Sequence, residues 1–126
     1  MASLLVVDDD RDLAEAIVTA LESERHEIRI ANHGGEGLER IYENRPDLIL
    51  LDVQMPALDG PAMVRRLDPL DRDGSPIPIV LMSGIDGLAT IAERLGTPFF
   101  LRKPFGVDNL IQVVRAALEG HSASRP

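Results

Sequence analysis

The sequence predicts an α/β protein in which a parallel sheet is covered by helices on both faces. Short aliphatic runs alternate five times with longer segments whose apolar residues recur at helical spacing. The first and third runs contain only aliphatic residues, which is typical of strands buried on both faces of a sheet. Because strands that alternate with helices pair in parallel through right-handed crossovers, we expect a (βα)5 doubly wound sheet.

The length of the chain indicates one domain. Its 126 residues suffice for one hydrophobic core and are too few for two cores of ordinary size. Hydrophobic residues make up 44% of the chain but aromatic residues only 3%, so aliphatic side chains must fill that core. We expect the domain to span residues 1–118, and residues 119–126 to form a C-terminal tail or a truncated linker.

Composition also narrows the class of function. A net charge of -8 argues against direct binding of nucleic acid, which needs a basic patch, and favours a protein or a small anion as partner. The first aliphatic run has no basic residues before it and meets three aspartates, so it is neither a signal peptide nor a membrane span. The absence of cysteine excludes disulfides and thiolate metal sites, and we expect a cytoplasmic protein.

The first two strand–helix units have clear boundaries. Leu4–Val7 is an aliphatic run and forms the first strand. Arg11–Glu24 carries apolar residues at helical spacing, and Asp10 stands in the position of an N-cap. Glu27–Ala31 is predicted as the second strand and Gly35–Asn44 as the second helix.

The middle of the chain contains the third unit and the fourth strand. Leu48–Leu51 is the most apolar run and forms the third strand. A short helix is expected over Pro61–Leu67, because proline is accepted in a first helical turn. Asp68–Pro76 is rich in Asp, Gly and Pro and is predicted as a surface loop. The fourth strand is expected over Ile77–Met82, although Pro78 fits poorly in a central strand.

The last third of the chain supplies the remaining elements. Leu88–Leu95 is predicted as a helix and Phe99–Leu101 as the fifth strand. Val107–Leu118 has the amphipathic spacing of a closing helix.

Polar residues follow the strands where each aliphatic run ends. In open parallel sheets, ligands bind outside the carboxyl ends of the strands, so these side chains converge on the ligand-binding edge. One of them is the only lysine among thirteen Lys plus Arg residues. The residues at this edge are Asp8, Asp9, Asp10, Asp52, Ser83, Gly84, Lys103 and Pro104.

Each of these residues also has an ordinary structural explanation. Asp and Ser are common helix caps after strands, which would account for Asp10 and Ser83. Asp52 could be an ordinary residue before a turn, and Lys103 could be a solvated surface cation. The combination is harder to explain in this way, because several converging carboxylates repel one another unless a cation is supplied.

The residue types at this edge are suited to phosphoryl transfer. Oxygen ligands without cysteine favour a hard divalent cation, and Mg²⁺ fits best. A carboxylate can act as nucleophile while metal, ammonium and hydroxyl groups neutralise the phosphoryl oxygens. The three histidines, His26, His33 and His121, lie in predicted edge, loop and tail positions, and we expect none of them to be a ligand.

Four motifs in order resemble one family over nearly the whole chain. They are "LLVVDDD", "DLILLDVQMPALDG", "IVLMSG" and "FFLRKPF", each at the end of a predicted strand. Together they resemble the receiver domain of bacterial two-component response regulators. The resemblance implies a flavodoxin-like fold with strand order 2-1-3-4-5.

The same resemblance implies roles for the residues at the strand ends. Asp52 would be the phosphoacceptor, taking a phosphoryl group from a histidine kinase or a histidine phosphotransfer protein. Asp9 would bind Mg²⁺ directly, Asp8 largely through water, and Gln54 through its backbone carbonyl. Lys103 would be the ion-pair partner of the phosphoryl group.

The resemblance also implies a switch. Ser83 would donate its hydroxyl to a phosphoryl oxygen, and Phe100 would be the aromatic switch residue, where the family often has tyrosine. The peptide between Lys103 and Pro104 is expected to be cis. Gln54 and Ile85 occupy positions that tune dephosphorylation.

The switched surface would be the face formed by residues 88–95, 99–101 and 107–118. We expect that face to bind a downstream protein or a second copy of the domain.

Two other functions remain compatible with parts of this pattern. A phosphatase of the haloacid-dehalogenase kind also uses an aspartyl nucleophile, but it needs a second carboxylate two residues later, where this chain has Gln54. An interaction module with the receiver shape but without phosphorylation is the second alternative, and the complete set of site residues argues against it.

Overall fold

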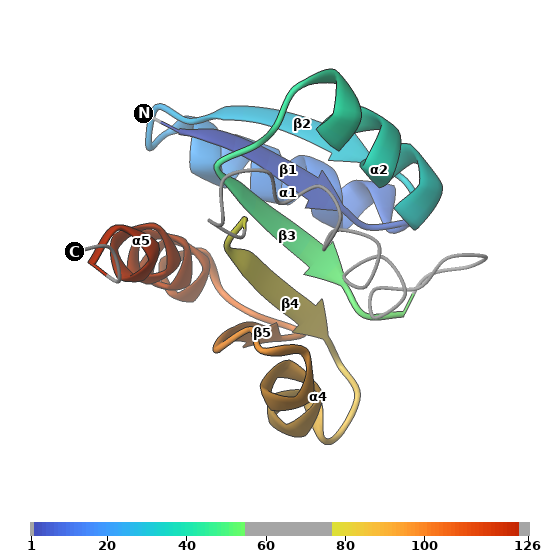
Figure 1. Ribbon diagram of the computed structural model, residues 1–126, viewed down its shortest axis with the longest axis vertical. Coiled ribbons are helices and arrows are strands. Elements are labelled where there is room, and N and C mark those ends of the chain that lie inside the picture. The colour runs from blue at the N-terminus through green and yellow to red at the C-terminus, as the bar shows by residue number, and fades with distance from the viewer. Residues whose placement is uncertain (1, 55–76, 124–126) are drawn as a thin grey trace.

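The computed structural model describes residues 2–54 and 77–123, with the side chains of 2–54 and 77–119. Within these ranges strands and helices alternate, as Figure 1 shows. The helix predicted over Pro61–Leu67 and the loop before the fourth strand lie outside the described residues.

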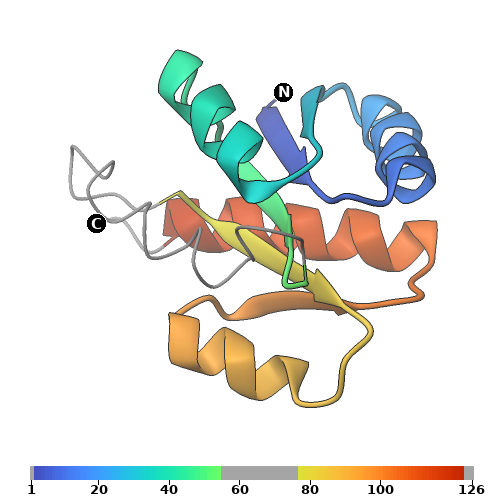
Figure 2. The same ribbon diagram turned by 90° about the vertical axis from the view of Figure 1, so that its right-hand side faces the viewer.

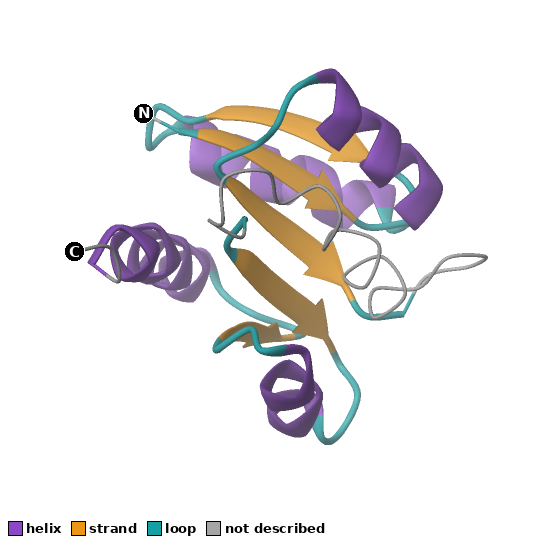
Figure 3. Ribbon diagram, in the orientation of Figure 1, coloured by secondary structure: helices purple, strands orange, loops and turns teal. Residues whose placement is uncertain are grey.

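Five strands form a single parallel sheet at the centre of the molecule (Figure 3). Their order is β2-β1-β3-β4-β5, and every neighbouring pair is parallel, which confirms the predicted flavodoxin-like fold. The strands are β1 (Ser3–Val7), β2 (Glu27–Ala31), β3 (Leu48–Asp52), β4 (Ile79–Ser83) and β5 (Phe99–Arg102).

The described helices cover both faces of the sheet. In Figures 1 and 2, α1 and α5 lie on one face, and α2 and α4 lie on the other. The helices are α1 (Arg11–Glu22), α2 (Gly34–Glu43), α4 (Leu88–Leu95) and α5 (Val107–Ala123). None of the helices in the described ranges has the length and apolar character needed to cross a bilayer.

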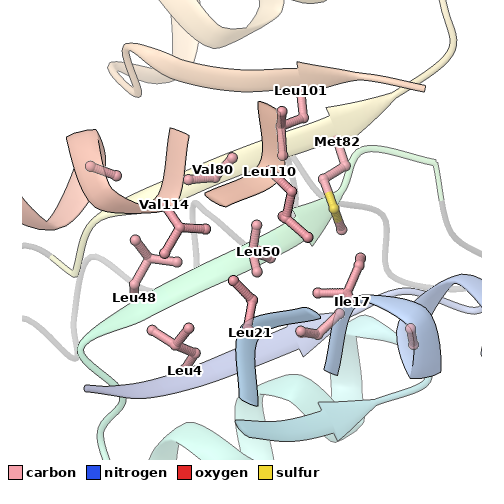
Figure 4. Close-up of a cluster of buried hydrophobic side chains, with 13 residues drawn as sticks. Leu4, Ile17, Leu21, Leu48, Leu50, Val80, Met82, Leu101, Leu110 and Val114 are labelled. Carbon is pink, nitrogen blue, oxygen red and sulfur yellow. The ribbon is translucent and has the colours of Figure 1, made fainter. Parts of the chain in front are cut away.

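Alternation along the strands divides the core into two layers. In β3, Leu48 and Leu50 face α1 and α5, whereas Ile49 and Leu51 face α2 and α4. Figure 4 shows the first of these layers, with strand side chains meeting those of both helices. Because β3 is buried on both faces, it needs the continuous aliphatic run that predicted it.

Element boundaries differ from the prediction by one or two residues in most strands and helices, and by more at the end of the last helix. The fourth strand begins at Ile79, since Pro78 has no amide hydrogen for the ladder and contributes only its carbonyl, which accepts from the amide of Ile49. The last helix does not end at Leu118 but continues to Ala123. The role of residues 119–126 as a tail or a linker stays a prediction.

Candidate functional site

The predicted site residues lie at the carboxyl ends of the strands. Asp8 directly follows β1, Asp52 ends β3 and Ser83 ends β4, while Lys103 directly follows β5. The parallel register places Asp52 opposite Met82, and Ser83 opposite Arg102. Residues far apart in sequence therefore meet at one edge of the sheet.

Three carboxylates form a cluster at this edge. One oxygen from each of Asp8, Asp9 and Asp52 lies within 4.8 Å of the others. Asp8 is completely buried and Asp52 is 4% exposed, whereas Asp9 is exposed to solvent. The cluster therefore has two carboxylates held inside the protein and one at its mouth.

The loop backbone fixes the two buried carboxylates. The amide of Asp10 donates to Oδ1 of Asp8 over 2.9 Å. The amide of Gln54 donates to Oδ1 of Asp52 over 3.1 Å. In both cases the second carboxylate oxygen, Oδ2, receives no backbone hydrogen bond in the described part of the chain and faces the ammonium of Lys103.

Lys103 is the cation of the cluster. Its Nζ lies 2.9 Å from Oδ2 of Asp8 and 3.7 Å from Oδ2 of Asp52. Its backbone amide donates to the carbonyl of Ser83 over 2.9 Å, which ties the ends of β4 and β5 together. The peptide between Lys103 and Pro104 is cis, as the sequence predicts.

Burial and the neighbouring charges shift the pKa of Asp52. Burial raises the pKa of the Asp52 carboxyl from 3.8 to about 6. The hydrogen bond from Gln54 lowers this pKa, repulsion from Asp8 raises it, and Lys103 lowers it less than Asp8 raises it. Most Asp52 side chains are therefore ionised at neutral pH, which lies only about one unit above this pKa.

Ser83 is also buried at the site edge, with 1% of its surface exposed. Its Oγ accepts a hydrogen bond from the amide of Ile85 over 3.1 Å. Since this bond uses a lone pair of the hydroxyl, its hydrogen remains able to donate. Ile85 itself packs against the core layer under α2 and α4.

Phe100 lies apart from the carboxylate cluster. Its ring is on the α4 side of β5, and it is 38% exposed. It borders a surface cavity of about 380 Å³ between α4 and β5. The cavity is lined by Ala89, Ala92, Glu93, Gly96, Thr97, Pro98 and Phe100.

Two histidines have structural roles away from the cluster. Nδ1 of His26 accepts from the amide of Ala2, and Nδ1 of His33 accepts from the amide of Glu36 at the start of α2. That neither is a metal ligand stays a prediction, and the side chain of His121 lies outside the described set.

An ion pair beside the site has no signal in the sequence. Nη2 of Arg102 lies 2.7 Å from Oδ1 of Asp86 and links the end of β5 to the loop after β4. Both side chains are largely exposed, so the pair contributes little to stability.

The donor atoms of the cluster are suited to a hard cation. Carboxylate oxygens of Asp8, Asp9 and Asp52 come together without sulfur or imidazole among the described residues. Oxygen ligands at this spacing fit a divalent ion such as Mg²⁺. The cluster could therefore hold a metal ion.

Comparison with known proteins identifies the family. Residues 4–115 match the response regulator receiver domain family. The chain belongs to this family. As a receiver domain it is part of two-component signalling, and its cluster of Asp8, Asp9 and Asp52 is consistent with a phosphoacceptor site.

Similar proteins include full-length regulators and isolated domains. The response regulator MprA of Mycobacterium leprae is 35% identical over 117 residues, which are 91% of this chain and 50% of that protein. NtrX from Brucella abortus, solved in complex with ADP, has a TM-score of 0.89 at 34% identity, covering 98% of this chain and 28% of its own.

A response regulator receiver domain protein (CheY-like) from Methanospirillum hungatei JF-1 has a TM-score of 0.86 at 25% identity, covering 98% of both chains. By contrast, the receiver domain spans about half the length of the curated relatives it matches.

Proposed function

We propose that this receiver domain accepts a phosphoryl group on Asp52 from a histidine kinase or a histidine phosphotransfer protein, in a Mg²⁺-dependent reaction. The observation that carries the proposal is the buried Asp52 carboxylate beside Lys103 and two further carboxylates. On this proposal the domain is a cytoplasmic switch that catalyses only its own phosphorylation and dephosphorylation.

The hydrogen bonds at Asp52 indicate which oxygen reacts. Oδ1 accepts from the amide of Gln54, so Oδ2 is the freer nucleophile. Oδ2 forms the new O–P bond as the N–P bond of phosphohistidine breaks, and the imidazole, which already carries a proton on its other ring nitrogen, keeps the bonding electrons and leaves as neutral imidazole. The ammonium of Lys103 then offsets the negative charge of the phosphoryl oxygens, and the hydroxyl of Ser83 donates a hydrogen bond to one of them.

Mg²⁺ would be held by the carboxylates of Asp8, Asp9 and Asp52 together with the backbone carbonyl of Gln54. The ion supplies positive charge that offsets the cluster and the phosphoryl oxygens. Asp9, the exposed member, is the carboxylate most open to an incoming cation.

Phosphorylation would change the face formed by α4, β5 and α5. A phosphoryl group adds nearly two negative charges next to the loop of Ser83, whose hydroxyl can donate to it. Phe100 and the cavity beside it lie on that face, so a rearranged loop could change the position of the ring. The face would bind a downstream protein or a second copy of the domain, and the domain itself would not contact nucleic acid.

Incubation with Mg²⁺ and acetyl phosphate tests the proposal. We expect a mass increase of one phosphoryl group that is lost in Asp52→Asn and in the presence of EDTA. Asp47→Asn serves as the matched control, because Asp47 is an exposed residue that accepts from the amide of Ser3 at the opposite end of the sheet.

Absence of a mass increase in the wild-type protein would overturn the proposal and favour an interaction module that is not phosphorylated. Sustained release of phosphate from a phosphomonoester such as p-nitrophenyl phosphate, rather than from acetyl phosphate, would instead favour a phosphatase.

A further inference from the structure

Lys103 is bonded to Asp8 rather than to Asp52. The 2.9 Å separation between Nζ and Oδ2 of Asp8 is that of a charge-assisted hydrogen bond. The 3.7 Å separation from Oδ2 of Asp52 is too long for a hydrogen bond. The ammonium of Lys103 therefore neutralises Asp8, one of the three clustered carboxylates. The proposed phosphoacceptor, Asp52, has no direct hydrogen bond to this ammonium.

Both oxygens of the Asp8 carboxylate are occupied by protein donors. Oδ1 accepts from the amide of Asp10, and Oδ2 accepts from Lys103. Asp8 is completely buried, and removing one partner of a buried ion pair leaves an uncompensated charge inside the protein. Lys103 thus supplies the positive charge that a divalent cation would otherwise bring to this carboxylate.

An ammonium and a divalent cation bound to the same small cluster repel each other. One oxygen of each of the three carboxylates lies within 4.8 Å of the others, so two cations bound to them would interact at close range in a partly buried site. We propose that Lys103 is the resident counter-ion of Asp8, competes with the divalent cation, and moves from Asp8 to Asp52 when that cation binds.

This inference rests on the cation-binding part of the proposed function and adds an order to it. Lys103 becomes available at Asp52 only once the cation has replaced it at Asp8. Cation binding and preparation of the phosphoacceptor are then a single coupled event, and the free protein is protected from the repulsion among its own carboxylates.

Calorimetric titration with Mg²⁺ measures the competition. Replacing Lys103 by Met keeps the length of the side chain and removes the ammonium, so we expect Mg²⁺ affinity to rise by about 10-fold or more. Arg102→Met is the matched control, because it also removes one positive charge and lies next to Lys103 in the sequence. The charge that it removes belongs to an exposed ion pair outside the cluster. In the Asp8→Asn background, Lys103→Met should change affinity by less than about 3-fold.

A second readout uses the fact that the chain has a single lysine. Protein labelled with ¹³C-lysine should give one side-chain Cε signal, and that signal should shift on addition of Mg²⁺ with the same dissociation constant as the calorimetry. If Lys103→Met unfolds without Mg²⁺, the milder Lys103→Gln and the labelled wild-type protein still provide the test.

The possible outcomes separate the two proposals. Mg²⁺ binding with an unmoved lysine signal, or an equal gain of affinity in Arg102→Met, would overturn the competition and leave the proposed function intact. If neither the wild-type protein nor Lys103→Met binds Mg²⁺, the cation-dependent function and this inference both fail.

Discussion

The carboxylate of Asp52 is buried, and the nearby ammonium of Lys103 does not fully neutralise its charge. Its carboxyl has a pKa of about 6 in the folded protein against 3.8 ordinarily, so the folded state prefers the protonated form. Below pH 3.8 the carboxyl is protonated in both states and leaves the free energy of unfolding unchanged, whereas between pH 3.8 and about 6 that free energy falls, because the unfolded chain releases the proton first. At neutral pH the ionised carboxylate lowers the free energy of unfolding by about 3 kcal/mol.

Asp52→Asn should therefore be more stable than the wild-type protein in EDTA at pH 8, by about 3 kcal/mol, and the difference should shrink at pH 5. The reason is that Asn carries no charge to desolvate or to repel Asp8. Urea unfolding at the two pH values measures it. A stability gain of the same size at both pH values would contradict the assignment of the effect to ionisation.

Ile85 illustrates how a neighbour of the site could control the lifetime of the phosphorylated state. Its amide holds Oγ of Ser83, and its side chain packs on the core layer, so it is fixed next to the phosphoacceptor edge. We expect Ile85→Ala to admit water and to shorten the aspartyl-phosphate lifetime a few-fold.

Decay of the phosphorylated mass after removal of the phosphodonor measures this lifetime. Ile91→Ala is the control, because Ile91 packs on the same core layer from within α4. An unchanged lifetime in Ile85→Ala, or equal shortening in both variants, would contradict a shielding role.

At the scale of elements, the ends of α2 are held by side chains from outside the helix. At its start Nδ1 of His33 accepts from the amide of Glu36. At its end the guanidinium of Arg29 on β2 donates to the carbonyls of Arg40 and Asn44. An edge strand thus gives a second donor to the carbonyl of Arg40, which already accepts from the amide of Asn44, and also bonds the carbonyl of Asn44, the C-cap residue.

Arg29→Met should lower the free energy of unfolding by about 1–3 kcal/mol, because two hydrogen bonds from a charged donor are lost while the aliphatic part of the side chain is kept. Urea unfolding checks this. Arg11→Met should change stability by less than about 0.5 kcal/mol, since the ion pair between Arg11 and Glu15 is exposed to solvent. Equal effects in the two variants would argue against a specific cap.

At the scale of the whole molecule, the sheet is the support on which the site is built. Leu50 lies in the middle of β3, is completely buried, and contacts the layer shared by α1 and α5 (Figure 4). Two residues later the same strand carries Asp52, so packing around Leu50 holds the proposed phosphoacceptor in place.

Leu50→Ala should cost about 3 kcal/mol of stability, within the range for buried leucines that leave a cavity. Val107→Ala, at an exposed position, should cost well under 1 kcal/mol. Denaturant unfolding in Mg²⁺-free buffer compares the two. A loss below about 1 kcal/mol in Leu50→Ala would mean that the layer collapses around the missing side chain.

Much of this architecture follows from local sequence signals. The aliphatic run of β3 predicted a doubly buried strand, and Asp10 predicted the start of α1, where its side chain accepts from the amide of Leu13. Such signals work because burial periodicity and capping depend on residues within one turn or one strand. The motifs at the strand ends likewise predicted which residues would share one edge.

Tertiary structure decided which of those residues pair. The sequence placed Lys103 near both Asp8 and Asp52, but only the fold shows the ammonium bonded to Asp8, 95 positions away. The cap that Arg29 makes on α2 and the link from Arg102 to Asp86 are equally invisible in the sequence. The physical reason is that strand identity and strand-end position are written in local periodicity, whereas the choice of partner for a long charged side chain depends on distances set by the packing of the whole sheet.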